Sequence, residues 1–202
     1  MVNASSDALW GVAPGAFVGV VGPSGAGKDS VIAGAQALLC NHASIVFPQR
    51  VVTWAPDVTE SNVNLSAREF EVVLSAGGFS LAWAAHGLSY GIPVEVDALV
   101  AHGRTVVVNV SRSVAPVLRT RYSRGRVVLI DAPQPVRRSR LAQRGREDDP
   151  AINGRLVREV DTFSSADADI VINNSKSIVE SARALADYLA SLTTLAVPVR
   201  TA

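Results

Sequence analysis

Residues 15–30 read GAFVGVVGPSGAGKDS, a valine-rich run followed by a glycine-rich turn and a lysine. The run at 16–21 is bounded by glycines and has the composition of a β-strand buried on both faces. Beyond Lys28 the apolar residues recur at helical spacing, at Val31, Ile32, Ala35, Leu38 and Leu39. The stretch therefore predicts a strand, a glycine-rich loop and a helix in direct succession.

The turn matches the phosphate-loop pattern and stands between a buried strand and a helix, the context that this pattern requires. Glycines let successive backbone N–H groups surround a phosphate, and the helix N-terminus adds positive potential. Lys28 is expected to reach the β- and γ-phosphates of a nucleotide and to act in catalysis. The residues predicted to bind the nucleotide are Gly22, Pro23, Ser24, Gly25, Ala26, Gly27, Lys28, Asp29 and Ser30.

Two residues depart from the usual form of this pattern. Asp29 stands where a serine or threonine normally supplies a hydroxyl to Mg²⁺. Asn109 lies near the end of the expected strand 105–110, where an acidic residue is common in phosphate-loop enzymes. Since hard oxygen ligands suit Mg²⁺, we predict that Asp29 and Ser30 bind the metal and that Asp29 supplies the charge that Asn109 lacks.

The rest of the chain alternates strand and helix patterns. Further strands are expected at 45–52, 105–110, 127–131 and 170–173, and further helices at 113–122, 135–144, 150–161 and from Ser177 onward. The last helix has an apolar face of Ile178, Ala182, Leu185, Leu189 and Leu192. Such alternation predicts an α/β fold, with a mainly parallel sheet covered by helices on both faces.

The segment 54–97 is less regular. Ser66 and Glu69 form a capping box before a short helix, and short strands are expected at 79–83 and 89–91, with a helix from Pro93 to Val100. We predict a core at 14–53 and 98–193, an acceptor-binding insertion at 54–97, a lid at 143–155, and tails at 1–13 and 194–202.

Composition limits the function classes. The 202 residues fit one domain, 48% hydrophobic content excludes a disordered chain, and a net charge of +1 argues against nucleic acid as a partner. The single cysteine, Cys40, and a first stretch without a signal-peptide pattern favour the cytoplasm, and no membrane segment is expected. Whether the chain forms a homodimer stays open.

The basic residues are unevenly placed, because 13 of the 19 lie between Arg104 and Arg158. The run 143–149 between two expected helices has the composition of a mobile loop. Arg144 and Arg146 on that loop, with Arg155 on the next helix, are predicted to close over a transferring phosphoryl group and spread its charge. A solvated helix hairpin remains the alternative for the other arginines nearby.

Four stretches together resemble the ribose 1,5-bisphosphate phosphokinases of bacterial phosphonate catabolism, which are guanylate-kinase-like. They are the loop with its Gly-Lys-Asp-Ser ending, the stretch WAAHGLSYG at 83–91, the strand end VNVSR at 108–112, and RGRE at 144–147. The resemblance implies transfer of the ATP γ-phosphoryl group to the C1 phosphate of ribose 1,5-bisphosphate, which yields 5-phosphoribosyl 1-diphosphate (PRPP). It also implies ATP as the donor and places Asn173 near its base.

The acceptor site differs from that of guanylate kinases. These carry a Thr-Arg pair that grips the acceptor phosphate, whereas this chain has Thr53-Trp54. The candidates for binding the acceptor are Arg50, Glu60, Arg68, Tyr90, Glu95, Asn109 and Arg112. A guanylate or other nucleoside monophosphate kinase, or an inactive binding module of the same fold, remains the alternative.

Overall fold

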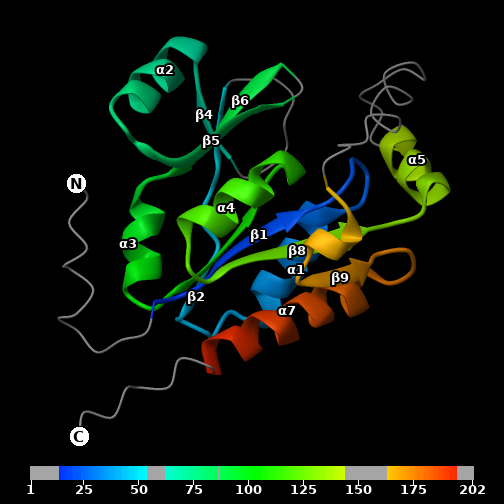
Figure 1. Ribbon diagram of the computed structural model, residues 1–202. Helices are drawn as coiled ribbons and strands as arrows, with labels where there is room; N and C mark the ends of the chain where they lie inside the picture. Colours follow the sequence, from blue (N-terminus) through cyan, green and yellow to red (C-terminus); the bar gives the residue numbers. More distant parts are fainter. Residues whose placement is uncertain (1–13, 54–61, 86, 144–162, 195–202) are drawn as a thin grey trace, which may run out of the picture.

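The computed structural model describes residues 14–53, 62–85, 87–143 and 163–194. Its core is a sheet in the order β2-β7-β1-β8-β9, and every pairing in it is parallel (Figure 1). The strands are β1 (Phe17–Val21), β2 (Ile45–Val46), β7 (Thr105–Asn109), β8 (Gly125–Asp131) and β9 (Ile170–Asn173). The predicted parallel α/β fold is confirmed.

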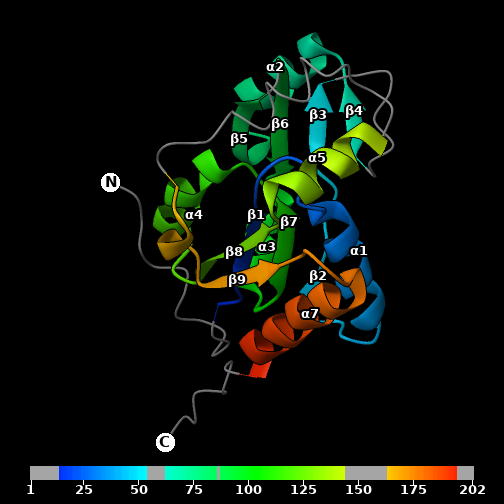
Figure 2. The ribbon, with the colours of Figure 1, turned by 90° about the vertical axis from the view of Figure 1, so that its right-hand side faces the viewer.

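Strand β1 is buried along its whole length because both faces of the sheet are covered. Val18 and Val20 pack in the cluster that includes residues of α1 (Lys28–Leu38) and α7 (Ile178–Thr194). Phe17 and Val21 pack in the opposite cluster, with α3 (Glu95–Ala101) and α4 (Ala115–Arg121). Figure 2 shows α7 and α1 on one side of the sheet and α4 on the other. Each fully buried valine or leucine contributes about 1.5–3 kcal/mol to folding.

A second sheet lies above the core sheet in Figure 1 and has the order β4-β3-β6-β5. Its strands are β3 (Val51–Thr53), β4 (Val63–Leu65), β5 (Phe79–Ala85) and β6 (Leu88–Pro93), and α2 (Ala67–Ser75) follows β4. The predicted capping box of Ser66 and Glu69 begins α2, and Phe70 of that helix stacks on Phe79 at 4.6 Å between ring centroids. The small sheet includes β3, which precedes the predicted insertion.

Several element boundaries differ from the sequence predictions. The single strand expected at 45–52 is two strands in different sheets, with Pro48, which has no backbone N–H to donate, in the break between them. Pro93 ends β6 instead of opening a helix, so α3 begins at Glu95. Ile178 is 44% exposed, although the other four residues of the predicted α7 face are buried. The helix expected at 150–161 lies outside the described residues.

Two of the remaining described elements follow the carboxyl ends of parallel strands, and a third precedes a strand. Helix α5 (Gln134–Gln143) follows β8, a 3-10 turn η1 (Arg112–Val114) follows β7, and η2 (Ser165–Asp167) precedes β9. The phosphate loop follows β1, so it lies at the same edge as the ends of β7, β8 and β9. Ligands of open parallel sheets bind at that edge. No helix among the described residues is long and apolar enough to cross a membrane.

Candidate active site

The phosphate loop takes its shape from glycines with left-handed backbone angles. Gly25 has φ 79° and Gly27 has φ 88°. A Cβ added at Gly25 would lie 2.7 Å from the carbonyl oxygen of Arg137, and one added at Gly27 would lie 2.6 Å from Nδ2 of Asn174. Both positions therefore require glycine for backbone conformation and for space.

The loop presents hydrogen-bond donors that the described residues leave unused. The backbone N–H groups of Gly25 and Gly27 have no acceptor within the described part of the chain. The Lys28 ammonium donates to the carbonyl oxygens of Gly22 at 2.9 Å and Pro23 at 3.2 Å, so it lies over the loop. Unpaired N–H groups beside an ammonium at a helix N-terminus suit the phosphates of a nucleotide.

The two unusual residues of the motif contact each other. Asn109 Nδ2, at the end of β7, donates to Asp29 Oδ1 in the first turn of α1 at 2.6 Å. The Asp29 side chain is 40% exposed, so its carboxylate remains accessible. Within the described residues no group of three or more His, Cys, Asp or Glu side chains could hold a metal ion by itself. Asp29 therefore offers one accessible carboxylate at the loop, an oxygen ligand of the kind that divalent cations prefer.

Arg50 joins this pair to the small sheet. It immediately precedes β3, and its side chain is only 12% exposed. One guanidinium nitrogen donates to the Asn109 carbonyl oxygen at 3.2 Å and the other lies 4.0 Å from Asp29 Oδ1. The guanidinium also lies 5.7 Å from the centre of the Tyr90 ring. We call Asp29, Arg50, Tyr90 and Asn109 the junction group.

Tyr90 is itself fixed by a second aromatic ring. Its ring stacks on Trp83 with 5.4 Å between centroids and 7° between planes. The two side chains come from adjacent antiparallel strands, β6 and β5, where they are direct cross-strand partners. The small sheet therefore presents a rigid aromatic pair beside a cation, at the place predicted to bind the acceptor.

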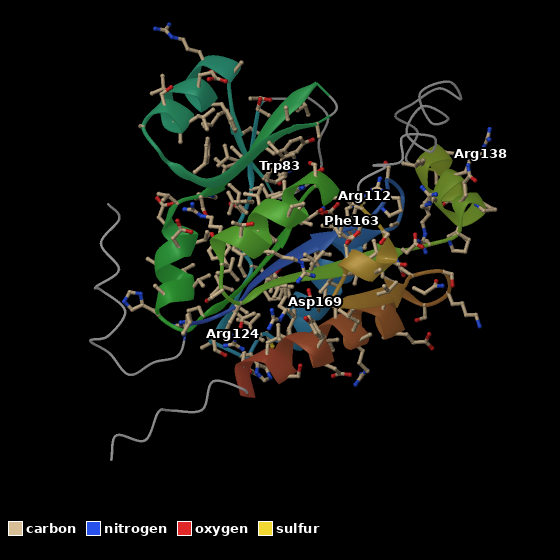
Figure 3. The ribbon with its side chains drawn as sticks, viewed as in Figure 1. Trp83, Arg112, Arg124, Arg138, Phe163 and Asp169 are labelled. Carbon is tan, nitrogen blue, oxygen red and sulfur yellow. The ribbon has the colours of Figure 1, made fainter. Side chains whose placement is uncertain are left out.

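The structure places the other predicted site residues less centrally. Arg112 begins η1, three residues after Asn109 (Figure 3), whereas Arg68 on α2 and Glu95 at the start of α3 are exposed, with no described contact to the junction group. Ser30 is exposed on α1, and Asn173 is exposed at the end of β9. The predicted residues Glu60, Arg144, Arg146 and Arg155 lie outside the described residues.

Two residues against the phosphate loop were not among the predicted site residues, although Asn174 directly follows the predicted Asn173. Asn174 is fully buried and its Nδ2 donates to the Ala26 carbonyl oxygen at 2.8 Å. Arg140 of α5 donates to the same oxygen at 3.3 Å and to the Asn174 carbonyl oxygen at 2.9 Å. The alternation of side chains along a strand could have identified Asn174 from the sequence. Asn174 continues the inward-facing positions of Ile170 and Ile172, whereas Asn173 faces outward.

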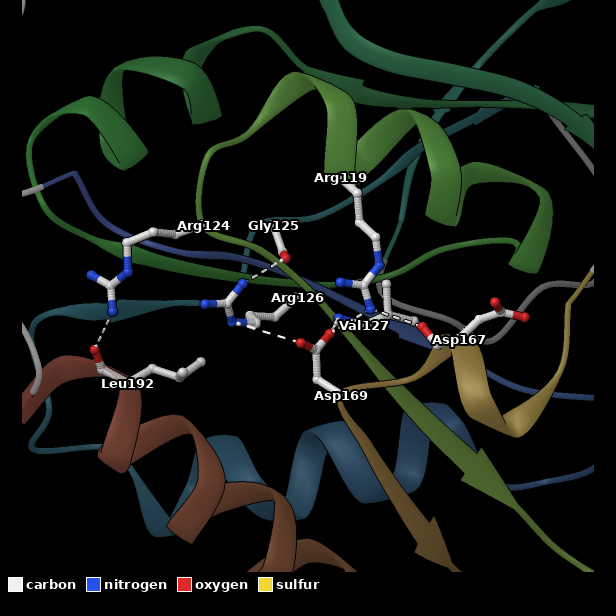
Figure 4. Close-up of polar contacts among 8 residues, drawn as sticks. All are labelled: Arg119, Arg124, Gly125, Arg126, Val127, Asp167, Asp169 and Leu192. Atoms are coloured by element: carbon white, nitrogen blue, oxygen red, sulfur yellow. Dashed lines mark hydrogen bonds and ion pairs between the residues drawn. The ribbon is translucent and has the colours of Figure 1, made fainter.

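Part of the basic stretch serves the opposite end of the sheet. Asp169, directly before β9, accepts hydrogen bonds from Arg119 at 2.8 Å and from the Val127 backbone at 2.7 Å (Figure 4). Arg126 lies 3.8 Å from the same carboxylate, and Arg124 donates to the Leu192 carbonyl oxygen at 2.9 Å. These three arginines join β8, β9, α4 and α7, so they stabilise the fold far from the loop.

Comparison with known proteins identifies relatives. No family model matches the chain. A ribose 1,5-bisphosphate phosphokinase of Bradyrhizobium diazoefficiens is 45% identical over 166 residues, which cover 82% of this chain and 83% of that protein. The corresponding enzyme of Rhodopseudomonas palustris is 41% identical over 178 residues, covering 88% and 90% of the two chains.

Solved structures agree on the fold. A guanylate kinase of Anaplasma phagocytophilum aligns with a TM-score of 0.63 at 18% identity, over 88% of this chain and 86% of that one. A sugar kinase of Janibacter aligns with a TM-score of 0.53 at 16% identity, over 91% of this chain and 99% of that one. The fold is that of the guanylate-kinase-like phosphate-loop kinases, and by its sequence relatives the chain belongs to the ribose 1,5-bisphosphate phosphokinase family.

Proposed function

We propose that the protein transfers the γ-phosphoryl group of ATP to the C1 phosphate of ribose 1,5-bisphosphate, which forms PRPP and ADP. The observation that carries this proposal is the junction group. It sets Arg50 and Tyr90 of the small sheet against Asp29 of the phosphate loop, so an acceptor phosphate bound by Arg50 would lie next to the phosphates of the nucleotide. The relatives of the chain are named as kinases of this same acceptor.

The reaction requires little acid–base catalysis by the protein. A phosphate monoester has a second pKa near 6, so at neutral pH the attacking oxygen is already ionised and needs no side-chain base. That oxygen forms a bond to the γ-phosphorus while the bond between this phosphorus and the β–γ bridging oxygen breaks, and the electron pair leaves with ADP. The side chains must align the two phosphates and neutralise their charge.

Each residue of the site has a role in this scheme. Lys28 and the unpaired loop N–H groups hold the β- and γ-phosphates, and Arg50, backed by Tyr90, binds the C1 phosphate of the acceptor. Asp29 and Ser30 would hold Mg²⁺, which neutralises charge on the β- and γ-phosphates when it is bound. Arg144, Arg146 and Arg155 remain the proposed lid arginines, and Asn173 the proposed contact to adenine.

The acceptor is the feature that separates this proposal from a nucleoside monophosphate kinase. Arg50 is the only basic residue between Lys28 and Arg68, and Trp54 stands where guanylate kinases carry an arginine. The missing arginine at position 54 argues against GMP as the acceptor, and Arg50 is the basic residue of this stretch that remains to bind an acceptor phosphate. The cytoplasm is the proposed location.

Phosphorus NMR of the purified protein with ATP, Mg²⁺ and ribose 1,5-bisphosphate tests the proposal. We expect a new pair of coupled diphosphate signals on C1 together with ADP, and no such signals with Lys28→Ala. Faster ADP release with GMP as acceptor would instead establish a guanylate kinase, and absence of ADP with every acceptor would establish a binding module.

A further inference from the structure

We propose that Asn174 is a positioning residue for the phosphate loop, which acts with Arg140 by holding the Ala26 carbonyl oxygen on the outer side of the loop. The inference rests on the proposed function only in taking the loop as the nucleotide site. It concerns two side chains that touch neither substrate in that scheme.

The first step is the geometry of one peptide unit. Asn174 Nδ2 and one guanidinium nitrogen of Arg140 both donate to the Ala26 carbonyl oxygen, at 2.8 and 3.3 Å. In a planar trans peptide the carbonyl oxygen and the following N–H point in opposite directions. Fixing the oxygen of Ala26 therefore directs the N–H of Gly27 to the other side, away from Asn174. That N–H is one of the loop donors that have no acceptor among the described residues.

The second step is that the loop cannot hold this peptide unit by itself. Ala26 lies between two glycines, and glycine populates positive and negative φ about equally. Rotation of the peptide unit would turn its carbonyl oxygen toward the phosphates, where it would repel them and remove one donor. The contacts that fix this peptide unit must therefore come from outside the loop. Asn174, between β9 and α7, and Arg140 of α5 provide them.

The third step is that Asn174 is itself held in one orientation. Its side chain is fully buried, and its Oδ1 accepts a hydrogen bond from Ser181 Oγ at 3.1 Å. The Ala26 oxygen can only accept, so the NH₂ side of the amide must face the loop. The backbone of Asn174 is also fixed, since its N–H donates to the Asp131 backbone carbonyl oxygen at 2.7 Å and its carbonyl oxygen accepts from Arg140.

The fourth step concerns space. A Cβ at Gly27 would lie 2.6 Å from Asn174 Nδ2, so the amide lies directly against the loop with no room for a side chain between them. Arg140 lies on the last turn of α5, just before the predicted lid at 143–155. The same carbonyl oxygen thus links the phosphate loop to β9, α7 and the helix that leads to the predicted lid.

The test is Asn174→Asp, which keeps the size of the side chain but sets an acceptor against the Ala26 oxygen. Isothermal titration with Mg²⁺ and ADP, without acceptor, should show binding weakened about tenfold. In turnover, KM for ATP should rise while KM for ribose 1,5-bisphosphate stays unchanged. Asn64→Asp makes the same chemical change at an exposed position of β4 and should bind ADP as the wild type does.

Ser181→Ala keeps the proposal testable if Asn174→Asp does not fold. This variant removes the donor that orients the amide and should weaken ADP binding by a smaller factor, with the same rise confined to KM for ATP. Ser191→Ala, on the exposed side of the same helix, is the matched control. If Asn174→Asp folds and binds ADP as tightly as the wild type, the proposal is overturned. If Asn174→Asp does not fold, wild-type ADP affinity in Ser181→Ala overturns it instead. Equal increases of KM for ATP and KM for ribose 1,5-bisphosphate would also overturn it. Absence of PRPP from the wild-type protein would refute the proposed function alone, because ADP titration does not depend on the acceptor.

Discussion

We propose Arg50 as the residue that binds the acceptor phosphate. Its side chain is largely buried, and its charge faces Asp29 on one side and the Tyr90 ring on the other. A bound acceptor phosphate would add a second anion beside this guanidinium. Hydrogen bonds to charged groups are worth about 1.5–3 kcal/mol, which makes this contact large enough to govern acceptor affinity.

We therefore expect Arg50→Gln to raise KM for ribose 1,5-bisphosphate roughly 10- to 100-fold, the equivalent of that energy, with a much smaller effect on KM for ATP. Steady-state kinetics with each substrate varied in turn measures both values. Arg183→Gln, which removes an exposed charge from α7, is the control and should change neither. An equal rise of KM for ATP and KM for ribose 1,5-bisphosphate would show that Arg50 supports the structure and does not bind the acceptor.

Asp29 and Asn109 form a hydrogen-bonded pair and should act as one unit toward the metal. Asp29→Asn should raise the Mg²⁺ concentration needed for half-maximal turnover by about tenfold, because it removes the one carboxylate at the loop. The double variant Asp29→Ser with Asn109→Asp restores the hydroxyl and the carboxylate in the more common arrangement, and should recover part of the loss. Unchanged magnesium dependence in Asp29→Asn would contradict a metal-binding role.

At the scale of elements, one polar cluster joins the small sheet to the core. Asp97 of α3 accepts hydrogen bonds from Ser80 of β5 at 2.7 Å, from Tyr122 at 2.5 Å and from Arg121 of α4 at 2.6 Å. The Tyr122 ring stacks on Phe17 of β1 at 4.5 Å. The cluster thus fixes β5 against α3, α4 and the central strand.

Loss of the Asp97 charge should loosen this contact. Asp97→Asn should lower the free energy of unfolding by about 1–3 kcal/mol, because Tyr122 and Ser80 are buried and would lose a charged acceptor. Urea unfolding followed by circular dichroism measures the change. Glu95→Gln, an exposed position on the same helix, should leave stability unchanged, and a similar loss there would show that the effect is not specific to the cluster.

The same cluster predicts how stability depends on pH. Partial burial alone would raise the pKa of Asp97, but the hydrogen bonds from Tyr122, Arg121 and Ser80 lower it below 3.8. Its contribution is therefore present above pH 3.8 and is lost as pH falls through the lowered pKa. Burial, and then the hydrogen bond to Asp97, raises the pKa of Tyr122 from 10.0 to about 12.

Folding thus favours the neutral phenol of Tyr122, so its contribution is complete below pH 10 and decreases as pH rises toward 12. Thermal unfolding at a series of pH values should show a decline in this alkaline range that is weaker in Tyr122→Phe. An identical alkaline decline in the two proteins would contradict this assignment.

For the whole molecule, ligand binding should stabilise the fold as a unit. The phosphate loop is held by β1, α1, α5 and α7, so a ligand that binds it acts on the central sheet, on α5 and on the helical layer of α1 and α7. ADP with Mg²⁺ at 100 times its Kd should add about 2.7 kcal/mol, which raises Tm by roughly 5–10 °C for a chain of this length. Differential scanning calorimetry measures the shift, and Lys28→Ala should abolish most of it. A full shift in that variant would mean that ADP binds elsewhere.

Local sequence patterns were sufficient where an element depends on its own residues. The loop between β1 and α1, the capping box before α2 and the strands β5 and β6 are each encoded within a few neighbouring residues, and the structure confirms them. The strand expected at 45–52 was wrong because both its halves are β-forming, and only the pairing of each half assigns it to a different sheet.

The sequence by itself determined the strand, the loop, the lysine and the parallel α/β class, since hydrophobic periodicity and glycine conformations are properties of the local chain. The tertiary structure decided the contacts of the site. Asp29 meets Asn109 across 80 positions and Ala26 meets Asn174 across 148, because β1 lies beside β7 and β8 beside β9. Strand order sets those contacts, and it depends on how whole helices and strands pack, which no local pattern contains.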